Sequence, residues 1–158
     1  MTYEILENPN PIRDIFLKEH VNTESFNPQE LMWQHLNKEI EEVSIDKAIR
    51  KLKKIKTPVY FISECEGNPT FNNCALEEYE EDKKGFACLA DTEWLTEVLE
   101  YEWFNKGAVM FDGFNLGSDN TLPDDVYVFD NSASWFAVFT QEWDGEDLDS
   151  RLCYLYNL

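Results

Sequence analysis

The sequence predicts an α+β domain in which N-terminal helices pack on a mainly antiparallel sheet. Up to about residue 57, apolar residues recur at three- and four-residue steps, and beyond it they form short runs rich in β-branched and aromatic residues. The last runs follow one another on short polar turns, which is typical of an antiparallel meander. Helices that precede such strands are characteristic of the α+β class. The 158 residues fit a single domain over 1–158, helical over about 12–57 and sheet-rich over about 58–158, with about five strands.

Two helices are expected before residue 44. The chain starts irregularly with a turn at residues 8–11, and apolar residues then indicate a short helix near 12–20. A better helix is expected from Asn27, a favourable N-cap, with Pro28 at the first helical position. Its apolar stripe would consist of Leu31, Met32, Leu36, Ile40 and Val43.

Two more helices are expected further along the chain. Ser44 can cap a helix over 45–56, which ends because the residue before Pro58 disfavours the helical region. Its six outward cations could touch nucleic acid or a membrane, but a solvated face that can pair with the acidic part, within the molecule or in a dimer, is favoured, because the total charge argues against nucleic acid. Asp91 or Thr92 can cap a helix over 93–104, with Gly107 as its C-terminal stop.

Strands are expected wherever the apolar period shortens. The candidate runs are 59–62, 85–90, 108–111, 126–129, 135–140 and 152–156. Residues 64–84 and 113–123 are expected to be connections, with polar turns at 130–134 and 144–150. Phe129, Phe136 and Phe139 are expected in the core.

Charge is distributed very unevenly along the chain. Residues 1–63 hold 10 acidic and 9 basic residues, whereas residues 64–158 hold 22 acidic and only 4 basic ones, within a net charge of −19. So negative a surface repels nucleic acid and anionic lipid and attracts a basic protein. An aromatic content of 15% is too high for a disordered acidic tail, so the charge should lie on a folded body.

No motif predicts an enzyme, a cofactor or a metal site. His20 and His35 pair locally with no Cys or Ser in a known arrangement, and neither a phosphate-binding glycine motif nor HExxH occurs. The run from Asp144 resembles a Ca²⁺ loop superficially but lacks the required Gly and Glu. No apolar run is long enough for a membrane helix, and no signal peptide is recognisable, so a cytoplasmic location is expected.

The four cysteines are expected to be small buried side chains in a reducing compartment. Cys88 and Cys153 lie inside apolar, strand-like runs. A disulfide between Cys65 and Cys74 is the alternative if the protein is secreted.

Acidic and aromatic residues alternate in the C-terminal part, which suggests a docking surface for a cationic protein. Carboxylates can take the place of nucleic-acid phosphates in contacts with Arg, and Tyr and Trp dominate binding hot spots. The candidate partner-binding residues are Trp94, Glu97, Glu100, Tyr101, Glu102, Asp124, Asp125, Trp135, Glu142, Trp143 and Asp144.

One stretch resembles a known class of proteins. Residues 122–135 read LPDDVYVFDNSASW and run on to Thr140-Gln141-Glu142. This pattern of aromatic strand, polar turn and Trp is similar to the C-terminal hairpin of small bacterial proteins, several of them grouped with immunity proteins of polymorphic and contact-dependent toxin systems. Many of those have His where this chain has Gln141. The resemblance covers roughly residues 94–156 and implies an inhibitor of a cognate toxin.

The sequence therefore favours an acidic cytosolic protein that neutralises a basic partner, with a nuclease-type toxin as the expected target. Two other interpretations remain open. The first is a housekeeping or phage-derived protein whose acidity serves only solubility. The second is a small hydrolase that uses paired carboxylates.

Overall fold

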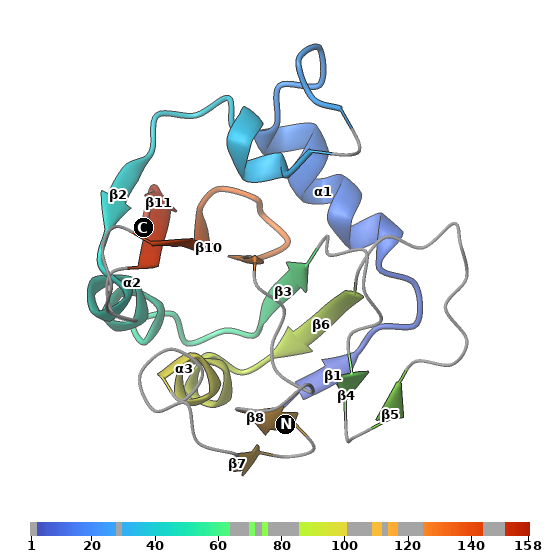
Figure 1. The fold of residues 1–158 in the computed structure, drawn as a ribbon, viewed down its shortest axis with the longest axis vertical. Helices are drawn as coiled ribbons and strands as arrows, with labels where there is room; N and C mark the ends of the chain where they lie inside the picture. Colours follow the sequence, from blue (N-terminus) through green and yellow to red (C-terminus); the bar gives the residue numbers. More distant parts are fainter. Residues whose placement is uncertain are drawn as a thin grey trace.

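A seven-stranded antiparallel sheet with helices on both faces forms the body of the protein (Figure 1). The computed structural model describes residues 3–27, 30–63, 70–71, 74–75, 86–100, 109–111, 114–116, 125–143 and 151–158. Helices and an antiparallel sheet in one body confirm the expected α+β class.

The sheet has more strands than the five expected. In spatial order they are β1 (Tyr3–Ile5), β6 (Phe86–Ala90), β3 (Val59–Ser63), β9 (Val126–Phe129), β10 (Phe136–Trp143), β11 (Arg151–Tyr156) and β2 (Glu41–Val43). The meander β9–β10–β11 is confirmed, with Phe136 opposite both Phe129 and Tyr156. Two separate pairs join β4 (Thr70–Phe71) to β5 (Cys74–Ala75) and β7 (Val109–Phe111) to β8 (Phe114–Leu116).

In the described ranges, four helical segments accompany the sheet. They are α1 (Asn10–His20), the short 3₁₀ helix η1 (Met32–His35), α2 (Ile45–Leu52) and α3 (Thr92–Glu100). The expected cap of α2 is confirmed, since the Ser44 hydroxyl accepts the Lys47 backbone N–H at 3.2 Å. The helix is shorter than the expected 45–56 and gives way to a turn after Leu52.

The helix expected from Asn27 to Val43 is wrong. Within this stretch the structure has η1, and then β2, which pairs with β11 through Val43 opposite Cys153. Leu36 forms an isolated antiparallel bridge with Val21. The apolar spacing is satisfied by these tertiary partners instead of a helix, because pairing across the sheet outweighs a weak local helical preference.

Three smaller differences come from strands at unexpected places. The irregular N-terminus contains β1, whose Tyr3 lies opposite Ala90 at one edge of the sheet. The expected connection 113–123 contains β8, and the connection 64–84 contains β4 and β5. The acidic turn at 144–150, the end of the expected helix 93–104 and Cys65 lie outside the described residues.

The central strands of the sheet bury both of their faces. Successive side chains of a strand point to opposite faces, so Val126 and Val128 pack with α2 and α3, whereas Tyr127 and Phe129 pack with α1 and η1. In Figure 1, α1 lies on one side of the sheet and α2 and α3 lie side by side on the other. The result is three layers, and the expected core positions Phe129, Phe136 and Phe139 are fully buried.

Candidate functional site

Helix α3 presents its carboxylates outward. Its apolar side chains, among them Leu95, Val98 and Leu99, are buried against the sheet and α2. Glu93 and Glu97 are exposed, and Glu100 is partly exposed. The Thr92 hydroxyl donates to the Ile55 carbonyl at 2.6 Å and fixes the start of the helix to the segment after α2. The amphipathic pattern therefore produces an acidic face on a firmly held element.

A hollow of about 660 Å³ lies beside this face, lined by four carboxylates, two lysines and threonine side chains. The carboxylates belong to Asp91, Glu93, Glu97 and Glu100. The Lys53 ammonium pairs with Glu100 at 2.7 Å, and the Lys56 ammonium donates to the Lys53 carbonyl at 3.1 Å. The carboxylates outnumber the cations, so the hollow favours an additional positive charge.

The other expected partner-binding residues divide into two groups. Trp94, Asp125 and Trp135 are buried, with 5%, 4% and 6% of their surface exposed. Glu142 and Trp143 lie in β10, and Tyr101, Glu102, Asp124 and Asp144 lie outside the described residues. Glu97 and Glu100 are therefore the expected residues that the described structure brings together on one accessible face.

The two buried tryptophans have structural partners. Trp94 stacks on Tyr3 with ring centroids 4.5 Å apart, and this contact joins α3 to the edge strand β1. The Trp135 indole N–H donates to the Asp130 carboxylate at 3.0 Å. Both rings therefore stabilise the fold beneath the surface.

The polar turn between β9 and β10 is organised by Asp130. Its carboxylate accepts the backbone N–H of Ser132 at 2.9 Å as well as the Trp135 indole N–H. Partial burial raises the pKa of Asp130, but hydrogen bonds from Ser132, Trp135 and Ala133 outweigh it and hold the pKa below its usual range. Ala133 adopts a positive φ of 52° in this turn. The polar turn and the tryptophan of residues 130–135 therefore have a structural role in this hairpin.

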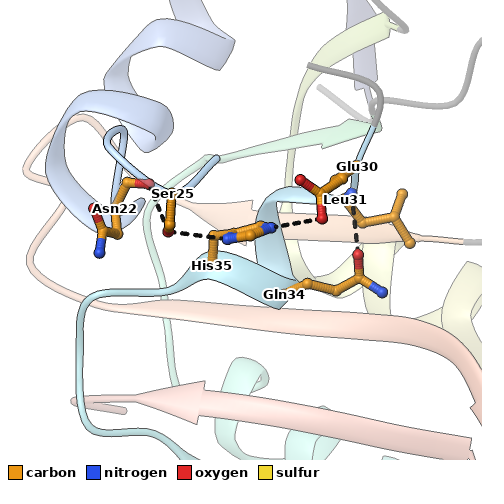
Figure 2. Close-up of polar contacts among 6 residues, drawn as sticks. All are labelled: Asn22, Ser25, Glu30, Leu31, Gln34 and His35. Carbon is orange, nitrogen blue, oxygen red and sulfur yellow. Dashed lines mark hydrogen bonds and ion pairs between the residues drawn. The ribbon is translucent and has the colours of Figure 1, made fainter. Parts of the chain in front are cut away.

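A serine, a histidine and a glutamate meet near η1, which the sequence did not predict (Figure 2). The Ser25 hydroxyl lies 3.0 Å from Nδ1 of His35, and Nε2 of the same ring lies 3.1 Å from the Glu30 carboxylate. The Ser25 and Glu30 residues are exposed, and the His35 side chain retains 17% of its exposure. The expected helix over this stretch concealed the arrangement, because it is a turn that brings Ser25 back to His35.

His20 is enclosed by aromatic rings at the end of α1. Phe136 lies edge-on to the imidazole at 4.7 Å, and Phe16 and Tyr156 lie at 5.1 and 5.7 Å. Burial lowers the pKa of His20, and the nearby Lys38 lowers it further, while Glu19 and the Ala133 backbone act in the opposite direction. The ring is therefore held mainly in its neutral form.

The buried cysteines are confirmed as core residues. Cys88 and Cys153 are buried thiols inside the sheet, and burial raises the pKa of Cys88 well above its usual value. A thiol held in its protonated form is a poor nucleophile and a poor metal ligand. Within the described part of the chain, no three His, Cys, Asp or Glu side chains gather in a way that could hold a metal ion.

No comparison with known proteins assigns a role to these residues. None of the helices in the described ranges has the length and apolar character needed to span a membrane. No protein-family model, curated protein or solved structure matches the chain.

Proposed function

We propose that the protein is an acidic cytosolic binding protein that neutralises a basic protein partner, acting as an immunity protein that blocks a nuclease-type toxin by occlusion. The observation that carries the proposal is the outward face of α3, where Glu93, Glu97 and Glu100 border a hollow of about 660 Å³. The uneven charge along the chain supports it, since the segment that contains α3 carries nearly all of the net charge of −19.

The carboxylates of α3 would first affect the rate at which the two proteins associate. A field of one sign steers an oppositely charged partner and raises the association rate at low salt. A nuclease-type toxin presents Arg and Lys where it binds phosphates, and carboxylates can occupy these groups through charge-assisted hydrogen bonds.

The hollow offers a position for one such cation after the encounter. A partner guanidinium that enters it would meet Glu93 and Glu97, which form no ion pair with any described residue. It would also compete with Lys53 for Glu100, in an exposed ion pair whose contribution to stability is below about 1 kcal/mol. Exchange of one exposed cation for another costs little, so the resident ion pair does not oppose binding.

The experiment is affinity capture from the lysate of the native host at low salt, with elution at high salt and mass spectrometry. The test variant reverses Glu93 and Glu97 to Lys. The control variant reverses Glu7 and Asp14, which are exposed near or on α1 at the other face of the sheet. Both variants change the net charge equally, so they separate the acidic face from overall charge.

A single stoichiometric basic protein is expected with the wild type and the control variant, and its capture should fall at least tenfold with the α3 variant. Inhibition of its activity by the purified wild-type chain would complete the case. Capture of a diffuse set of cationic proteins, reduced equally by both variants, would contradict the proposal and favour acidity that serves only solubility.

A further inference from the structure

The proton positions in the Ser25–His35–Glu30 cluster follow from its partners. A carboxylate can only accept hydrogen bonds, so Nε2 of His35 carries the proton donated to Glu30 at 3.1 Å. In the neutral ring the other nitrogen, Nδ1, then has a free lone pair. This lone pair faces the Ser25 hydroxyl at 3.0 Å (Figure 2).

Among the described residues, the Ser25 hydroxyl has one alternative acceptor, the Asn22 carbonyl, at 3.3 Å. That oxygen already accepts the backbone N–H groups of Ser25 and Phe26, at 3.3 and 3.0 Å, which use both of its lone pairs. The hydroxyl proton is therefore directed to His35, the arrangement in which an imidazole acts as a base toward an alcohol.

Backbone contacts hold the two segments of the cluster together. The Asn22 N–H donates to the His35 carbonyl at 2.7 Å, and the Asn37 N–H donates to the His20 carbonyl at 2.9 Å, on either side of the Val21–Leu36 bridge. The Trp33 N–H donates to the buried Tyr127 hydroxyl at 3.0 Å and anchors η1 to the sheet. These backbone hydrogen bonds thus hold the segments that carry Ser25 and His35 in a fixed position relative to each other.

We propose that Ser25 is an activated nucleophile with His35 as its general base and Glu30 as the positioning residue, forming a site for acyl transfer from activated esters. This site is separate from the acidic face of α3 and does not depend on the proposed binding function. In the first step a bond forms between Oγ of Ser25 and the acyl carbon, the bond to the leaving aryloxide breaks, and the Ser25 proton moves to Nδ1 of His35, which passes it to the aryloxide. Water then attacks the acyl-serine, His35 takes up one proton of the water, and it returns this proton to Oγ of Ser25 as the acid leaves.

The backbone around Ser25 limits the range of substrates. The N–H of Glu24 donates to the Asn22 side chain at 3.1 Å, and those of Ser25 and Phe26 donate to the Asn22 carbonyl. These three N–H groups are thus engaged within the turn and do not stabilise a developing oxyanion, which is a large part of catalysis on ordinary amides and esters. The site therefore fits acyl or phosphonyl donors with good leaving groups, such as aryl esters and fluorophosphonates.

The test uses the full chain with two probes, p-nitrophenyl acetate for turnover and a fluorophosphonate for labelling, with mass spectrometry to locate the adduct. Ser132 provides an internal control, because it is an exposed serine whose hydroxyl bonds to a carboxylate and a second serine but to no imidazole. We expect Ser25 to be labelled at least 10²-fold faster than Ser132, the lower end of general-base catalysis. The S25A and H35A variants should lose this reaction, and S132A should keep it.

The role of Glu30 is tested by comparing Glu30→Gln with Glu30→Leu. The side-chain oxygen of Gln can still accept the Nε2 proton of His35 and should keep most of the labelling rate, whereas Leu cannot accept it and should lose this rate. Rescue by the conservative variant separates positioning through this hydrogen bond from a merely structural role. Circular dichroism and Tm of each variant separate loss of reactivity from loss of fold. Labelling of Ser25 no faster than of Ser132 in the folded wild type, or turnover undiminished in a folded S25A, would overturn the proposal.

Discussion

His20 shows how one buried side chain links the packing of α1 to pH. Its ring lies against Phe16, Phe136 and Tyr156, and the surrounding apolar groups disfavour the imidazolium form. The sequence placed His20 near a helix end but did not reveal its burial, because two of the three aromatic rings around it, Phe136 and Tyr156, come from β10 and β11, more than a hundred residues away.

We expect the free energy of unfolding to decrease as the pH falls below about 6.5, the ordinary pKa of His20. The unfolded chain takes up a proton there, whereas the folded chain, with its lowered pKa, takes it up only at lower pH. The slope reaches at most about 1.4 kcal/mol per pH unit between the two values. Urea unfolding from pH 7.5 to 5.5 measures it. His20→Phe keeps an aromatic ring and should abolish this component, and an identical slope in that variant would contradict the assignment.

At the scale of single elements, the β9–β10 hairpin is the part that the sequence predicted best. Its two strands alternate between the two buried faces, and Asp130 holds the turn through hydrogen bonds that are local in sequence. The segment 27–43 is the opposite case. Its N-cap and apolar spacing favour a helix locally, but Val43 finds its partner in β11, and Leu36 finds its partner in Val21. When an apolar pattern fits both a helix and an interrupted strand, residues far away in the chain determine which secondary structure forms.

Asp130→Asn should destabilise the protein by about 1–2 kcal/mol at pH 7, because a charged acceptor of hydrogen bonds from Ser132, Ala133 and Trp135 is replaced by an amide that has only one acceptor oxygen. Since the folded pKa of Asp130 is lowered, the contribution is present above the usual carboxyl pKa and disappears as the pH falls through the folded value. Chemical denaturation at pH 7 and pH 3 checks both statements. Asp14→Asn, at an exposed position of α1, is the matched control and should change stability by less than about 0.5 kcal/mol.

For the whole molecule, the apolar core and the net charge have opposite effects on the stability of the compact state. Two apolar layers bury most of the sheet, while a net charge of −19 repels itself in the compact state. Ion pairs such as Lys47–Glu41, Arg50–Asp46 and Lys53–Glu100 offset part of this repulsion, and the last of them joins the basic segment after α2 to the acidic part of the chain. Each pair is exposed, so its contribution to stability is small.

Added salt should therefore stabilise the protein. From 10 mM to 0.5 M NaCl the screening length falls from about 30 Å to a few ångströms, which removes long-range repulsion while close ion pairs lose little. We expect Tm to rise by several degrees, at roughly 2–4 °C per kcal/mol for a domain of this size. Differential scanning calorimetry measures the rise. The variant with Glu93 and Glu97 reversed to Lys should gain less, and a Tm that falls with salt would mean that attractive pairs dominate.

The spacing of apolar residues, the helix caps and the charge of the chain determine its fold class, several of its elements and its acidic surface. The change from helical to strand spacing, the Ser44 cap, the Asp130 turn and the excess of carboxylates all act over a few residues, so they can be recognised without a structure. Burial and convergence depend instead on partners far apart in the chain. Only packing shows that Trp94 and Trp135 are buried, and only the pairing of Val21 with Leu36 brings Ser25 to His35. Local preferences are worth fractions of a kcal/mol per residue, whereas burial and sheet pairing contribute more, so the tertiary partners decide wherever the two disagree.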